Sequence, residues 1–193
     1  KSFRDEEILL ADQVLVKKSD KILVIQSGFG FLGTVLGDNA DKVTMYETSA
    51  RASQFSKKNA ENNQIENFQV VNKPEISDIE ESFDKILYAP ADYTPVDLVK
   101  KRLAQAADKT TDEGNLYIAG KKKTGLKRYK NFLKQFSHSK KTGKRNGVKA
   151  YKFSEFTEPP AVSVEKNFKA KFEEEELEFK TSEGLFSSGK LDK

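Results

Sequence analysis

A run of four apolar residues that leads into a glycine-rich turn limits the possible folds of this chain more than any other feature. Ile22 to Ile25 is typical of a strand buried on both faces. It leads directly into a Gly-x-Gly-x-x-Gly segment made by Gly28, Gly30 and Gly33. This spacing is that of the turn between a strand and a helix in nucleotide-binding domains. The same glycines could equally serve a tight turn and close helix packing without any ligand.

An acidic residue in a suitable position favours the ligand interpretation. Glu47 ends the next strand-like run, and it follows the glycines by about twenty residues, where an acid would meet ribose hydroxyls. A solvated acid at the end of a strand remains the alternative. The candidate cofactor-binding residues are therefore Gly28, Gly30 and Glu47.

Segments with strand and helix patterns alternate along the chain. We expect helices at 5–15, 31–36, 50–62, 95–107 and 125–136, and strands at 21–26, 42–47, 68–71, 84–89, 115–119, 137–141 and 148–153. Alternation followed by a terminal hairpin predicts an α/β, Rossmann-like sheet that is mostly parallel, with one antiparallel terminal strand and helices on both faces. Ligands of such sheets bind beyond the carboxyl ends of the strands, where Gly28, Glu47 and Pro90 should lie.

Composition excludes several kinds of site. The chain has no cysteine and a single histidine, His138, so disulfides and thiolate metal sites are excluded and we expect no metal. No apolar run approaches the length of about 20 residues that crosses a bilayer, and we expect no membrane partner and a cytoplasmic location. The chain begins at Lys1 rather than at a methionine, so we expect it to be part of a longer polypeptide.

One segment carries charge of a single sign. Between Lys121 and Lys152 there are thirteen Lys and Arg residues and no Asp or Glu. Such a surface favours binding to RNA phosphates, although a solubilising surface balanced by the glutamates at 173–176 is the alternative. The candidate RNA-binding residues are Lys121, Lys122, Lys123, Lys127, Arg128, Lys130, Lys134, Lys144 and Arg145.

The pattern changes after residue 154. Pro159 and Pro160 lie in a segment that cannot continue a helix or a central strand, so we expect a domain at 1–154 and a linker at 155–166. Apolar residues then alternate with charged ones on either side of a run of glutamates, as in Phe168 and Phe172 before it and Phe179 after it. This predicts a hairpin with one apolar face, which must pack on something.

The glycine turn resembles that of class I S-adenosylmethionine-dependent methyltransferases of the small-domain (MTS) type, most closely the tandem RsmC-like group. Members of that group methylate a guanine of small-subunit ribosomal RNA. The family motif Asp-Leu-Gly-Cys-Gly-Tyr-Gly falls on residues 24–30, where Gly28 and Gly30 match but Val24 and Gln26 replace the aspartate and the leading glycine. The resemblance implies the fold of a class I methyltransferase and S-adenosylmethionine as the family cofactor.

Other positions of the family pattern are altered. The resemblance gives Glu47 the cofactor ribose, but the acid that would face the adenine falls near Pro74 and is missing. We therefore expect that this domain does not bind the cofactor. The family tetrad Asn-Pro-Pro-Tyr, which binds the target amino group and stacks on the base, falls on the segment Ala89, Pro90, Ala91 and Asp92. Only Pro90 is retained, so we expect no catalytic residue.

The end of the chain resembles the start of such a domain. Residues 184–192 match the family segment Gly-Val-Phe-Ser-x-x-x-Leu-Asp, which precedes the first helix of a catalytic domain. The simplest interpretation is a degenerate N-terminal domain followed by a hairpin and the opening of a truncated second domain at 167–193. The expected partners are ribosomal RNA or the small ribosomal subunit and a C-terminal catalytic domain of the same polypeptide. The alternatives are an active RNA methyltransferase, a purely structural scaffold, and a permuted single domain whose hairpin covers its own ligand mouth.

Overall fold

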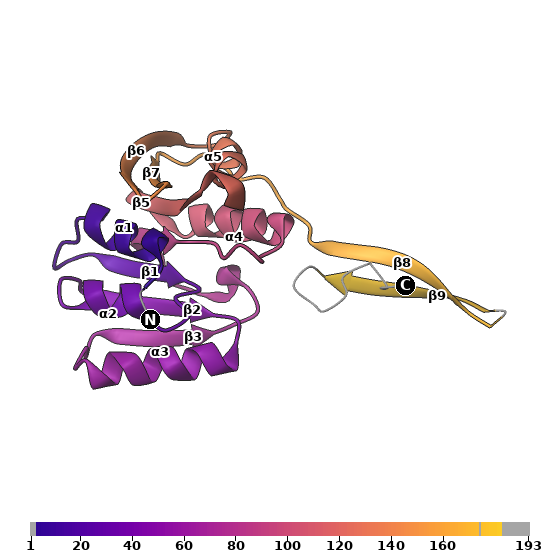
Figure 1. The fold of residues 1–193 in the computed structure, drawn as a ribbon, viewed down its shortest axis with the longest axis horizontal. Helices are drawn as coiled ribbons and strands as arrows, with labels where there is room; N and C mark the ends of the chain where they lie inside the picture. Colours follow the sequence, from indigo (N-terminus) through magenta and orange to yellow (C-terminus); the bar gives the residue numbers. More distant parts are fainter. Residues whose placement is uncertain (1–2, 174, 183–193) are drawn as a thin grey trace.

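The computed structural model describes residues 3–173 and 175–182 (Figure 1). The apolar run after Lys21 forms β1 (Lys21–Ile25), an inner strand of a seven-stranded sheet. The other strands are β2 (Lys42–Glu47), β3 (Phe68–Asn72), β4 (Phe83–Tyr88), β5 (Thr110–Lys121), β6 (His138–Arg145), β7 (Val148–Ser154), β8 (Glu165–Phe172) and β9 (Glu175–Ser182). The α-helices are α1 (Asp5–Gln13), α2 (Phe31–Gly37), α3 (Ala50–Asn62), α4 (Val96–Asp108) and α5 (Leu126–Leu133), and two 3₁₀ turns are η1 (Ile76–Asp78) and η2 (Lys122–Thr124).

The strand order of the large sheet is β3-β2-β1-β4-β5-β7-β6. The first five strands pair in parallel, and β7 pairs antiparallel with both β5 and β6. This arrangement confirms the predicted Rossmann-like sheet, mostly parallel with an antiparallel strand near one edge. The carboxyl ends of β1, β2 and β4 are brought side by side, since Ile25 is paired with both Tyr46 and Tyr88.

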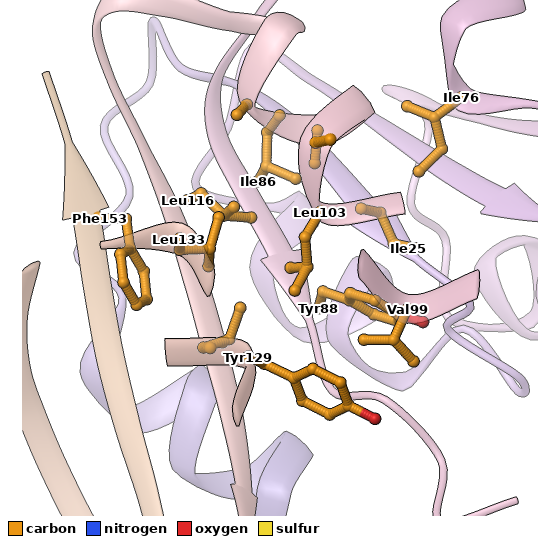
Figure 2. Close-up of a cluster of buried hydrophobic side chains, with 14 of the residues drawn as sticks. Ile25, Ile76, Ile86, Tyr88, Val99, Leu103, Leu116, Tyr129, Leu133 and Phe153 are labelled. Atoms are coloured by element: carbon orange, nitrogen blue, oxygen red, sulfur yellow. The ribbon is translucent and has the colours of Figure 1, made fainter. Parts of the chain in front are cut away.

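Helices cover both faces of the sheet, as predicted. Because successive strand residues point to opposite faces, Ile22 and Val24 pack in one core with α1, α2 and α3, whereas Leu23 and Ile25 pack in the other. Figure 2 shows the second core, in which side chains of α4 and α5 meet those of β1, β4 and β5. The core residues that it labels include Val99, Leu103, Leu116, Tyr129 and Leu133.

Several predicted boundaries were wrong, and among them α5 ends at Leu133, three residues before the predicted end at 136. Helix α1 ends at Gln13, and Leu15, which the helical pattern assigned to its apolar face, is 86% exposed. Strand β5 begins at Thr110, five residues earlier than predicted, and runs to Lys121. Strand β6 extends to Arg145, so that the basic turn predicted at 142–147 contracts to Asn146 and Gly147, both with positive φ. An Asn-Gly pair favours such a two-residue hairpin turn, because both of its residues tolerate the left-handed conformation.

The segment predicted as a linker packs partly on the domain. Residues 155–164 contain no helix or strand, yet Phe156 and Val162 pack against the core of α4 and α5, and Val164 is buried. The backbone N–H of Thr157 donates to the carbonyl of Phe136 at 2.9 Å. The segment is therefore fixed to the α4–α5 face before the chain enters β8.

Strands β8 and β9 form a separate antiparallel ribbon that projects away from the domain (Figure 1). The rings of Phe168 and Phe179 stack at 5.3 Å, and Phe172, Leu177 and Phe179 remain exposed. The predicted hairpin with one apolar face is present, and residues 165–182 do not fold over the glycine turn as the permuted alternative requires. The segment 184–192, which resembles the opening of a second domain, lies outside the described residues.

Candidate functional site

A cavity of about 850 Å³ lies at the carboxyl ends of β1, β2 and β4, where ligands of such sheets bind. Its wall contains two of the predicted cofactor residues, Gly28 and Glu47, and two residues of the altered catalytic tetrad, Ala89 and Ala91. The remaining lining residues are Phe3, Arg4, Glu7, Gln26, Ser27, Phe29, Thr48, Ser49, Ala52 and Tyr93.

The glycines of the turn have different structural roles. Gly28 and Gly30 both have positive φ, at 64° and 80°. A Cβ atom on Gly28 would meet no atom within 4 Å, whereas one on Gly30 would lie 3.1 Å from Cα of Ser56 in α3. Gly30 therefore permits the close approach of α3, and Gly28 faces open space.

The carboxylate of Glu47 is bound by the glycine turn itself. Its Oε1 accepts a hydrogen bond from Oγ of Ser27 at 2.9 Å and another from the backbone N–H of Gly28 at 2.6 Å. The residue is only 3% exposed. Burial raises the pKa of Glu47 above its ordinary value, although the hydrogen bonds from Ser27 and Gly28 act in the opposite direction. Glu47 thus fixes the position of Ser27 and of the Gly28 backbone in the glycine turn.

Gln26 takes the place of the family's leading glycine in an unusual conformation. Its φ is 53°, in the left-handed region that side chains rarely adopt. The hydroxyl of Tyr88 donates to Oε1 of Gln26 at 3.3 Å, and Nη1 of the buried Arg102 reaches the Tyr88 hydroxyl at 3.5 Å. The Gln26 side chain is therefore held within the wall of the cavity by residues of β4 and α4.

A side chain from near the start of the sequence lies at the end of β4. Nη2 of Arg4 donates to the carbonyl oxygen of Ala89 at 3.1 Å and to Oε1 of Glu7 at 3.0 Å. Asp92 is exposed and does not line the cavity, and the adjacent Tyr93 is 89% exposed at its rim. Sequence reasoning missed Arg4 and Tyr93, because no local pattern indicates that residue 4 reaches the end of β4.

The position expected for an adenine-facing acid also lacks one. The hydroxyl of Tyr46 donates to the carbonyl oxygen of Pro74 at 3.0 Å. Burial raises the pKa of Tyr46 to about 12, so the hydroxyl keeps its proton and remains a donor at neutral pH. The Tyr46 hydroxyl and the Pro74 carbonyl oxygen are therefore already bound to each other.

The predicted RNA-binding residues lie in different surroundings. Lys122, Lys127 and Arg128 line a second cavity on the α4–α5 face, of about 550 Å³. Arg145 contacts Asp5 at 3.5 Å and Asp12 at 3.6 Å, both on α1. The other members are distributed as follows: Lys121 lies 4.0 Å from Glu6, Lys130 lies over the ring of Tyr151 at 5.3 Å, and Lys123, Lys134 and Lys144 are exposed.

Because α1 and α5 pack on opposite faces of the sheet, the acids of α1 can reach only part of the basic segment. Within residues 3–173 and 175–182, no three potential metal ligands are grouped in a way that could hold an ion. None of the helices in the described part of the chain is long and apolar enough to span a membrane.

Comparison with known proteins gives a consistent result. The model of the methyltransferase small domain family matches residues 6–152. The 16S rRNA methyltransferase RsmC of T. thermophilus, solved with AdoMet and guanosine, is 22% identical with a TM-score of 0.82, covering 98% of this chain and 49% of its own. The chain thus spans about half the length of that relative.

Two further structures share the fold. A ribosomal protein L11 methylase of Lactobacillus delbrueckii subsp. bulgaricus is 15% identical with a TM-score of 0.65, over 78% of this chain and 77% of its own. An rRNA methylase of Streptococcus thermophilus is 10% identical with a TM-score of 0.60, over 78% of this chain and 94% of its own. At these identities the likeness concerns the fold.

Proposed function

The chain belongs to the methyltransferase small domain family, and we propose that it is a noncatalytic member, which supports RNA binding by a catalytic domain of the same polypeptide. One observation carries the proposal: the groups that would receive cofactor and substrate are hydrogen-bonded to the chain's own residues. Glu47 is bound by the glycine turn, and the carbonyl of Ala89 is bound by Arg4.

The wall of the cavity does not fit S-adenosylmethionine. The acid that would hold the ribose is 3% exposed, and its Oε1 already accepts two hydrogen bonds, so a ribose hydroxyl would have to compete for Oε1 or reach Oε2 of a buried side chain. The side chain of Gln26 stands where the family has a glycine, and it is fixed there by Tyr88. Pro74 stands where the acid that would face an adenine is expected, and the carboxylate of the adjacent Glu75 is bound by Lys101 and Gln105. Displacing several buried hydrogen bonds costs about 1 to 3 kcal/mol for each group left unpaired, which weakens binding strongly.

The end of β4 does not fit an acceptor for a target amino group either. Ala89 has no side-chain acceptor, and its carbonyl oxygen is approached by a cation that is itself held by the buried Glu7. An incoming amino group would have to compete with the guanidinium of Arg4. Asp92 offers no ring for stacking and does not line the cavity. These contacts support a domain without methyl transfer.

Calorimetric titration with S-adenosylmethionine tests the proposal. We expect a dissociation constant weaker than about 1 mM, which corresponds to about 4 kcal/mol of binding free energy or less. RsmC of T. thermophilus, whose structure contains AdoMet, serves as the positive control in the same buffer. A micromolar dissociation constant for this chain would overturn the noncatalytic assignment and favour an active RNA methyltransferase.

The β8–β9 ribbon supports the proposal of a partner domain. Its exposed apolar side chains, Phe172, Leu177 and Phe179, lie on an isolated two-stranded ribbon, which is marginally stable without a surface to pack on. We propose that the second domain supplies this surface.

A cytoplasmic location accords with the absence of cysteine, because no disulfide requires an oxidising compartment.

A further inference from the structure

The second cavity differs from the first in the sign of its charge. Lys100 of α4, Lys122 of η2 and Lys127 and Arg128 of α5 contribute to its wall, together with the side-chain amides of Asn131 and Gln135. None of the described residues that line it is Asp or Glu, whereas the cavity at the strand ends has both Glu7 and Glu47 in its wall. We call these four cations the basic groove.

Three of the four cations have no acid to neutralise them in the described part of the chain. Lys100 contacts Asp97 at 3.3 Å, one turn earlier on α4. Lys122, Lys127 and Arg128 form no ion pair with any residue of 3–173 and 175–182, in contrast to Arg145, which contacts two acids of α1. The groove therefore presents uncompensated positive charge, which attracts an anion from solution.

The groove is held in shape by the core beneath it. Leu126, Tyr129 and Leu133 are buried on one side of α5, which directs Lys127 and Arg128 to the other side. Gly125 joins η2 to α5 with a φ of 88°, and a Cβ atom there would lie 3.2 Å from the ring of Tyr129. The tight connection keeps Lys122 beside the first turn of α5. The backbone positions that carry these cations are thus fixed by the core.

We propose that the basic groove binds the phosphodiester backbone of RNA. The inference rests on the proposed function, and it assigns RNA contact to the α4–α5 face instead of the whole basic segment. Lysine ammonium and arginine guanidinium groups bind phosphate oxygens, and the amides of Asn131 and Gln135 supply further donors along the same wall. Contacts of this kind fix the position of the RNA and carry no sequence information.

A pair of charge-matched variants tests the groove. Lys122→Glu, Lys127→Glu and Arg128→Glu together alter the groove, and the control combines Lys140→Glu, Lys141→Glu and Lys149→Glu, three exposed positions on β6 and β7. Both variants reverse three positive charges, so any effect of net charge is equal. Binding of the 193-residue chain to a 16S rRNA transcript and to a uridine homopolymer is measured over a series of salt concentrations.

We expect the groove variant to bind both RNAs at least about tenfold more weakly at low salt. The slope of the logarithm of the binding constant against the logarithm of the salt concentration should become shallower by about 0.7 to 0.9 for each lost phosphate contact. The control should stay close to the wild type. Equal losses in the two variants would overturn the groove assignment and leave the proposed RNA binding intact. Absence of salt-dependent RNA binding by the wild type would overturn the proposed function and the inference with it.

Circular dichroism verifies that each variant is folded. If the glutamate set does not fold, Lys122→Gln, Lys127→Gln and Arg128→Gln replace it, with the same glutamine changes at Lys140, Lys141 and Lys149 as control. The expected order of affinities is unchanged, because the phosphate contacts are lost in either set. An unaltered affinity and salt slope in the neutral groove variant would also overturn the assignment.

Discussion

Alanine substitutions at Gly28 and Gly30 separate the cost of backbone conformation from the cost of packing. Both residues have a positive φ, and an L-residue in the left-handed region costs about 1 to 2 kcal/mol. At Gly28 the added Cβ meets nothing within 4 Å, so Gly28→Ala should cost only that amount. At Gly30 the added Cβ would lie 3.1 Å from Cα and 3.2 Å from the carbonyl oxygen of Ser56, both backbone atoms of α3.

The backbone of α3 cannot move aside as easily as a side chain, so we expect overpacking at Gly30 to cost a further ~1 to 3 kcal/mol. We therefore expect Gly30→Ala to lower the free energy of unfolding by about 2 to 5 kcal/mol in total. The entropy that alanine removes from the unfolded chain is the same at both positions, so it cancels from the difference. Equilibrium unfolding in urea, analysed with a shared m-value, measures both changes. Equal destabilisation of the two variants would refute the packing argument for Gly30.

Three further predictions concern single residues. Burial holds the pKa of Glu47 above its ordinary value, so its contribution to stability is lost as pH rises through that raised pKa. Glu47→Gln should remove this pH dependence from the free energy of unfolding measured in urea at a series of pH values, and an unchanged dependence would contradict it. Arg4→Ala should lower the free energy of unfolding by about 1 to 3 kcal/mol because Glu7 loses its partner, and Glu7→Gln in the same background should restore part of it. Leu133→Ala should lower the free energy of unfolding by about 2 to 5 kcal/mol, and Leu15→Ala by less than about 0.5 kcal/mol, because Leu133 is buried and Leu15 is exposed. Similar losses for the two variants in urea unfolding would contradict this difference in burial.

The order of strands and helices was predictable because burial leaves a direct trace in the sequence. Ile22 to Ile25 is an uninterrupted apolar run, as expected for a strand covered by helices on both faces, and it forms β1. Thr142 and Gly143 gave a misleading signal, since turn-forming residues also occur in strands such as β6 at the edge of a sheet. Leu15 matched the helical period, but α1 ends at Gln13, because the chain becomes extended at Val14.

The contacts that define the candidate site depended on tertiary structure. The altered glycine motif and the alanine at position 89 were visible in the sequence, but the hydrogen bond from Arg4 to Ala89 joins segments that no local pattern connects. Likewise, the count of cations between Lys121 and Lys152 could not show which acids lie nearby in the fold. Arg145 lies beside two acids of α1, whereas Lys127 faces none in the described part of the chain. The charge run therefore indicated where cations gather in the sequence and not which of them lie beside acids in the fold.

The two edges of the large sheet differ in their tendency to join another chain. Exposed edge strands present unpaired backbone groups that can template intermolecular β-pairing, and lysines on an edge oppose it. β6 carries Lys140, Lys141, Lys144 and Arg145 without any acid, so two such edges repel each other. β3 (Phe68–Asn72) has no charged residue. Aggregation of partly unfolded molecules should therefore begin at the β3 edge, and a lysine introduced in β3 should suppress it more than one added to β6.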